Sequence, residues 1–134
     1  MMRVNSMASR LFLFAFLLTA IALTRPHVHA QEGAKPLQVC ATVPELGSLV
    51  REVGGGRVSV TVFAKGTEDA HFVEAKPSFI KALSQCDLYI QVGMDLEIGW
   101  APVLLQNARN GAVLPGAPGF LDASKVISPL EIPT

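Results

Sequence analysis

The chain has 134 residues, of which 11 are basic and 11 acidic, so its formal net charge is zero. Removing the three arginines of residues 1–30, the targeting segment described next, leaves 8 basic and 11 acidic residues, so the mature net charge is 8 − 11 = −3. Such a chain offers no electrostatic attraction to nucleic acid or to an anionic membrane surface, and we expect neither as a partner. The length that remains after the N-terminal targeting segment described next is enough for one folded domain and too short for two.

A targeting segment is predicted at residues 1–30. Two arginines precede an uncharged, mostly apolar run at residues 11–23, and Val28-His29-Ala30 then forms a small-residue cleavage site. The apolar run is shorter than the roughly 20 residues that a membrane-spanning helix needs. We therefore predict cleavage after Ala30, export to the periplasm, and a mature chain of residues 31–134 that does not insert into the membrane. The alternative is an uncleaved membrane anchor.

Hydrophobic periodicity predicts strands that alternate with helices. The predicted strands cover residues 37–43, 58–64, 87–92 and 112–114. The predicted helices cover residues 44–53, 78–85 and 97–108. In the first helix an apolar stripe is expected against the sheet, formed by Leu46, Leu49, Val50 and Val53. Residues 116–134 lack clear periodicity and are predicted to be loop, with at most a short extended piece at residues 126–127 or 130–132.

This alternation predicts a doubly wound α/β fold. Parallel strands joined by right-handed helical crossovers are the usual solution for such a pattern. We expect a four-stranded parallel sheet with the strand order 2-1-3-4.

His71 is the candidate metal ligand. It lies in the loop after the second predicted strand, and ligands of open α/β sheets bind at this edge. Three carboxylates lie within three residues of it: Glu68, Asp69 and Glu74. An imidazole with oxygen donors suits zinc or manganese. The competing interpretation is a solvated surface histidine among acids.

The same segment carries a longer motif. Residues 66–78 read Gly-x-x-Asp-x-His-x-x-Glu-x-x-Pro-Ser, which resembles the first ligand loop of the metal-binding solute-binding proteins of ABC importers. Two prolines expected in that loop are replaced here by Ala70 and Ala75. The resemblance continues through Leu96-Glu97-Ile98-Gly99-Trp100 and covers essentially all of the chain after residue 36.

The resemblance implies a fold, a site and a function. Residues 31–134 would be the N-terminal lobe of a two-lobed protein whose second lobe is absent. His71 would bind a divalent metal ion, zinc most readily and manganese next, for delivery to a membrane permease. No second ligand can be transferred from the family to this chain.

Other polar and aromatic residues receive structural interpretations. Asp95 and Glu97 are interpreted as the start of a helix, where the macrodipole favours acids, rather than as ligands. Ser78 is interpreted as a helix-capping hydroxyl, and Trp100 as a packing residue. The sequence has no Cys-x-x-Cys or Gly-x-Ser-x-Gly motif, so we do not expect an enzyme. An independent small exported α/β domain with an unrelated ligand or an enzymatic activity remains the alternative.

Cys40 and Cys86 are the two cysteines of the chain. If the chain is exported they can pair, because the first and third strands are expected to be neighbours. The alternative is two small buried thiols that pack as hydrophobic side chains.

Overall fold

The computed structural model describes residues 35–128 and 130, and the predicted segment 1–30 lies outside them. Four strands form one sheet in the order β2-β1-β3-β4. The strands are β1 (Leu37–Ala41), β2 (Val58–Val62), β3 (Leu88–Gln91) and β4 (Phe120–Asp122). All three pairings are parallel. The predicted fold class and strand order are therefore confirmed.

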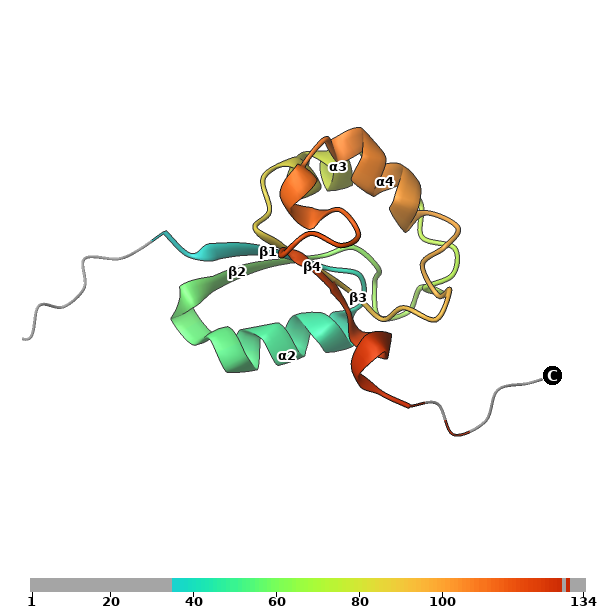
Figure 1. The fold of residues 1–134 in the computed structure, drawn as a ribbon, viewed down its shortest axis with the longest axis horizontal. Helices are drawn as coiled ribbons and strands as arrows, with labels where there is room; N and C mark the ends of the chain where they lie inside the picture. The colour runs from blue at the N-terminus through green and yellow to red at the C-terminus, as the bar shows by residue number, and fades with distance from the viewer. Residues whose placement is uncertain (1–34, 129, 131–134) are drawn as a thin grey trace, which may run out of the picture. The chain divides into compact units, whose positions relative to one another are not determined.

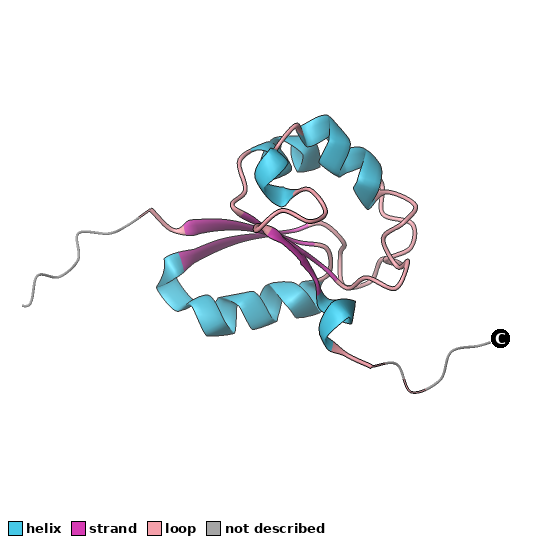
Figure 2. Ribbon diagram, viewed as in Figure 1, coloured by secondary structure: helices cyan, strands magenta, loops and turns pink. Residues whose placement is uncertain are grey.

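Helices cover both faces of this sheet. The α-helices are α2 (Pro44–Gly54), α3 (Pro77–Ser84) and α4 (Ala101–Ala108), and the short 3₁₀ helices are η1 (Gly55–Arg57), η2 (Gly111–Val113) and η3 (Ala123–Val126). Helix α2 lies on one face of the sheet, while α3 and α4 lie together on the other (Figure 1, Figure 2). Within the part of the chain that the structure describes, no helix is long and apolar enough to cross a membrane.

The α2 helix begins and ends where its sequence predicts. Pro44 occupies the first turn, where its missing N–H leaves no hydrogen bond unmade. Gly55 ends the helix with a φ of 54°, a positive value that glycine adopts at little cost because it has no Cβ atom. The predicted apolar stripe is only partly buried, however. Leu49 and Val53 are 62% and 81% exposed, because among residues 35–128 α2 is the one α-helix on its face of the sheet and leaves an apolar groove beside it.

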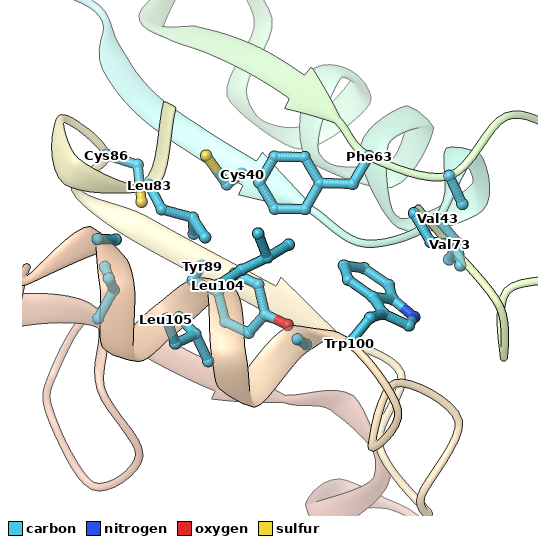
Figure 3. Close-up of a cluster of buried hydrophobic side chains, with 14 residues drawn as sticks. Cys40, Val43, Phe63, Val73, Leu83, Cys86, Tyr89, Trp100, Leu104 and Leu105 are labelled. Atoms are coloured by element: carbon cyan, nitrogen blue, oxygen red, sulfur yellow. The ribbon is translucent and has the colours of Figure 1, made fainter. Parts of the chain in front are cut away.

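The main core lies between the sheet and the helices α3 and α4. Among its most completely buried side chains are Leu83 of α3, Tyr89 of β3 and Leu104 of α4 (Figure 3). Aromatic rings extend the core toward the carboxyl edge of the sheet, where Phe63 stacks on Phe79. The core thus fixes the end of β2 from which the His71 loop departs.

The fourth strand is not where the sequence pattern placed it. Residues 111–113 form the 3₁₀ helix η2, and β4 lies at residues 120–122 in the segment predicted as loop. Asn110 holds the 3₁₀ turn by accepting a hydrogen bond from the Ala112 amide. Its amide nitrogen also donates to the carbonyls of Leu83 and Cys86, both at 2.8 Å. These bonds turn the chain away from the sheet before β4 begins.

Gly119 allows β4 to enter the sheet. A Cβ atom at this position would stand 2.5 Å from the Asp87 carbonyl oxygen and 2.6 Å from that of Ala112. The Gly119 carbonyl accepts a 2.8 Å hydrogen bond from the Tyr89 amide. The position of β4 therefore depends on a close approach between backbone segments, which the hydrophobic pattern of the sequence does not reveal.

Candidate metal centre

The candidate site lies at the carboxyl edge of the sheet. Hydrogen bonding continues beyond the strands, since the Phe63 amide donates to Ala41 and the Ala64 amide to Thr42, at 3.0 and 2.9 Å. Thr42 in turn donates to the Ile90 carbonyl at 3.0 Å. The chain following β2 is therefore held in register with β1 and β3 until Ala64, and the loop of residues 65–76 starts from a fixed point.

Within this loop Asp69 orients the His71 side chain. One carboxylate oxygen of Asp69 lies 2.9 Å from the His71 amide nitrogen and 2.9 Å from the ring nitrogen Nδ1. When Nδ1 donates to this oxygen, the lone pair of the imidazole is left on Nε2, the arrangement seen in carboxylate–histidine–metal triads. Both side chains are 59% exposed. The Nε2 lone pair is thus held in a fixed orientation at the surface of the domain, where it can bind a metal ion.

The charge on Asp69 is favoured by the same contacts. The hydrogen bonds from the His71 amide and ring lower the pKa of the Asp69 carboxyl below its ordinary value. Asp69 therefore stays ionised at neutral pH and remains an acceptor for the His71 ring.

The other two acids of the loop have different partners. Glu68 accepts a 3.1 Å hydrogen bond from the Lys65 amide and so closes the turn at the start of the loop. Glu74 lies 3.9 Å from the ammonium group of Lys76, in an exposed ion pair. Sequence spacing alone could not separate these roles, although an aspartate two residues before a histidine is suited to bonding its backbone amide.

Trp100 ties the loop to the rest of the domain. Its indole nitrogen donates a 2.9 Å hydrogen bond to the carbonyl of Ala70, the residue before His71. The ring is 4% exposed and meets Phe63 edge to face at 6.2 Å. The predicted packing role is confirmed, and the structure adds a polar contact that positions the His71 backbone.

Glu97 joins the ends of two strands. Its carboxylate is buried and accepts hydrogen bonds from the Thr42 hydroxyl at 2.7 Å and from the amides of Val92 and Gly93 at 2.8 and 3.1 Å. All three donors follow β1 or β3 directly. This carboxylate therefore already accepts three hydrogen bonds within the protein, and these bonds hold together the edge of the sheet at which the candidate site lies.

The interpretation of Asp95 and Glu97 as a helix start is wrong. Helix α4 begins at Ala101, and residues 94–100 form turns in which Met94 and Asp95 have φ values of 52° and 65°. The bonds made by Glu97 hold the backbone in these turns and delay the helix. The sequence pattern did not predict that Glu97 binds the strand ends. The local signal for this role is its position, four residues after Gly93, the glycine that follows the third strand.

Ser78 is not a helix cap. Lys76 is the N-cap residue of α3, its side chain makes no capping hydrogen bond, and Pro77 occupies the first turn. The helix therefore begins at a proline whose φ is already helical, without help from a hydroxyl.

The carboxyl edge also carries a polar cavity of about 270 Å³ beside the end of β4. Asp95 and Asp122 line this cavity, whereas His71 does not. Across residues 35–128 and 130, no three His, Cys, Asp or Glu side chains converge so as to hold a metal ion. The described residues thus offer one oriented imidazole and not a closed metal centre.

A doubly wound parallel sheet with an oriented imidazole at its carboxyl edge is the architecture expected of one lobe of a metal-binding solute-binding protein. Residues 39–131 match the family model described as ZnuA, zinc-uptake complex component A, periplasmic. The chain belongs to this family.

Individual relatives agree with this membership. The manganese-binding lipoprotein MntA of Halalkalibacterium halodurans is 28% identical over 110 residues, which are 78% of this chain and 36% of that protein. A crystal structure of ZnuA superposes with a TM-score of 0.58 at 27% identity, covering 73% of this chain and 36% of that one. A zinc-bound ZnuA deletion mutant gives a TM-score of 0.60 at 28% identity, covering 74% and 35%.

A more distant structure supports the fold alone. The periplasmic zinc-binding protein TroA of Treponema pallidum superposes with a TM-score of 0.55 at 21% identity, over 72% of this chain and 32% of that one. The chain spans about a third of the length of each of these relatives.

Proposed function

We propose that this chain takes part in capturing a divalent metal ion outside the cytoplasm for an ABC importer, with His71 as a metal ligand. The observation that carries the proposal is the His71 imidazole, held at Nδ1 by Asp69 and exposed at the carboxyl edge of the sheet. Family membership supports the same function. Zinc is the first candidate ion, because the matching family model and a 28% identical solved structure are both described with zinc; manganese is the second, because a 28% identical relative is described as manganese-binding.

The remaining ligands are proposed to come from a second lobe. Zinc takes four ligands, and the described residues bring one imidazole to the site together with the carboxylate that orients it. Residues 31–134 would then be the N-terminal lobe, with the ion held between two lobes, and the closed pair would be recognised by a membrane permease. The exposed side chains of Phe72, Met94 and Ile98, all in loops at this edge, are suited to an interface with a second lobe.

Export is part of this proposal. The predicted leader at residues 1–30 would direct the chain to the periplasm and be cleaved after Ala30. N-terminal sequencing of protein recovered from the periplasm should begin at Gln31. Recovery of the periplasmic protein with Met1 intact would contradict it.

Metal titration tests the role of His71. Alone, the full chain should bind zinc weakly, with water completing the coordination shell, and His71→Ala should weaken that binding by about tenfold or more. Glu74→Gln is the matched control, because Glu74 is an exposed acid three residues away whose partner is Lys76. Calorimetric titration with zinc and manganese would compare the three proteins. Tight stoichiometric binding by the chain alone, or weak binding that ignores His71, would contradict the proposal.

The alternative of an independent domain with an enzymatic activity is not favoured by the family. The relatives named above are described as metal-binding or zinc-uptake proteins. Within the described residues, the hydrogen bonds of the candidate ligand are to the carboxylate of Asp69.

A further inference from the structure

Cys40 and Cys86 lie together at the end of the core that is far from the proposed metal ligand. Both thiols are free and both residues are buried, at 2% and 4% exposure. Cys40 is in β1, where it pairs with Tyr89 of β3, and Cys86 lies between α3 and β3. Figure 3 shows their sulfur atoms near one another beside Leu83.

Backbone contacts fix these two positions relative to each other. The Asp87 amide donates to the Gln38 carbonyl at 2.8 Å, and the Gln38 amide donates to the Asp87 carboxylate at 2.8 Å. Cys86 directly precedes Asp87. Cys40 follows Gln38 by two residues, so its side chain lies on the same face of the strand as that of Gln38. The start of β1 and the residues just before β3 are therefore held side by side next to the two cysteines.

A groove leads to the thiols. It has a volume of about 330 Å³, and its lining includes Cys40, Cys86, Ser78, Lys81 and Gln85. The two thiols are close enough to change each other's pKa. The neighbouring Cys86 thiol, followed by burial, raises the pKa of Cys40, and the neighbouring Cys40 thiol lowers the pKa of Cys86. Lys81 places a positive charge in the lining of the groove, while the carboxylate of Asp87, next to Cys86, acts in the opposite sense and raises the pKa of that thiol.

We propose that Cys40 and Cys86 are a redox-active pair that closes to an intramolecular disulfide when the protein meets a disulfide oxidant through this groove. The Cys86 thiolate attacks one sulfur of the oxidant, forming a mixed disulfide and releasing one thiol. Cys40 then loses its proton to water, and its thiolate attacks the Cys86 sulfur and expels the second thiol. The protein gives up two electrons and two protons, and the oxidant gains them as two thiols.

The bond would link β1 to the junction between α3 and β3. The loop it closes contains α2, β2 and the whole His71 segment, because these lie between residues 40 and 86. Closing a loop of this length restricts the unfolded chain, so the oxidised protein should melt about 10 °C or more above the reduced one.

The test uses the full chain, first reduced and then equilibrated with oxidised glutathione. Samples are quenched with acid, unfolded, alkylated and weighed by mass spectrometry. We expect both alkylation sites to disappear together, with a mass lower by two hydrogens and no glutathione retained, and both to return on reduction. Two thiols that stay alkylatable, a retained glutathione adduct, or disulfide-linked dimers as the end product would overturn the proposal.

Single variants test the order of attack. Cys40→Ser should trap glutathione on Cys86, because no second thiol is present to displace it. Cys86→Ser should react at Cys40 more slowly, since Cys40 lies within the strand β1 of the sheet whereas Cys86 lies in the connection between α3 and β3. Melting curves of both variants show whether they are folded. Two folded variants that both fail to react would overturn access through the groove, and faster reaction of Cys86→Ser would overturn the order.

Discussion

Replacing Glu97 by Gln should destabilise the domain by about 2–4 kcal/mol. The carboxylate accepts one bond from Thr42 and two from the Val92 and Gly93 amides, and hydrogen bonds to charged groups contribute about 1.5–3 kcal/mol each. A glutamine keeps one oxygen for Thr42 and Val92 but turns an NH₂ group toward the Gly93 N–H. One charge-assisted bond is lost and two are weakened, while the smaller cost of burying a neutral amide offsets part of the loss.

Urea denaturation of the full chain would measure the effect. Trp100 is the single tryptophan of the sequence and is buried, so its fluorescence reports the unfolding of this edge. Glu52→Gln, on the exposed surface of α2, is the control and should change stability by less than about 0.5 kcal/mol. Thr42→Val should cost less in the Glu97→Gln background than in the wild type. A Glu97→Gln variant as stable as the control would refute the role of this carboxylate.

Three further substitutions probe the same edge. Trp100→Phe should cost about 1–3 kcal/mol in urea denaturation and also weaken zinc binding, because the hydrogen bond to the His71 loop is lost; unchanged zinc binding would show that this bond does not position the ligand. Gly93→Ala should destabilise by about 2 kcal/mol or more, since φ is 87° and a Cβ would collide with the Asp122 carboxylate, whereas Gly56→Ala meets no atom within 4 Å and should be nearly neutral. Hydrogen bonds from the hydroxyl and the amide of Ser124 lower the pKa of the Asp122 carboxyl below 3.8. The charge-dependent part of the stability difference between wild type and Asp122→Ala should therefore persist at pH 3.8 and be lost as pH falls through the lowered pKa, and its loss already above pH 3.8 would contradict the shift.

The elements built from local patterns were predictable. The β1–α2–β2 segment combines a buried apolar run, a proline at a helix start and glycines at a helix end, and each signal acts within a few residues. The strand order followed because parallel strands joined by helices leave few topologies. The loop that carries His71 was placed correctly for the same reason, since it follows β2 directly.

Contacts between residues far apart in the sequence determine the features that the sequence did not predict. The β4 strand depends on Gly119 passing close to Asp87 and Ala112, and no periodicity within residues 112–122 encodes that approach. The start of α4 depends on the bonds of Glu97 to Thr42, a residue 55 positions earlier. At the candidate site the sequence supplied three acids near His71, and only the geometry of the loop singles out Asp69 as its partner.

That choice leads to a direct test. Asp69→Ala removes the acceptor of the His71 Nδ1 bond, so the imidazole can rotate, and losing a hydrogen bond that orients a ligand weakens metal binding by about 10–100-fold. Glu68→Ala changes a neighbouring acid whose hydrogen bond goes to the Lys65 amide, and it should leave zinc affinity within about twofold, the smaller change expected of an acid that does not hold the His71 ring. Zinc titration of the full chain measures both variants, and NMR of the His71 ring gives the tautomer independently of binding. In the wild type the proton should be on Nδ1, and in Asp69→Ala the two tautomers should exchange. If both acid variants lose affinity equally, loop charge governs the site; if neither does, Asp69 does not orient the ligand.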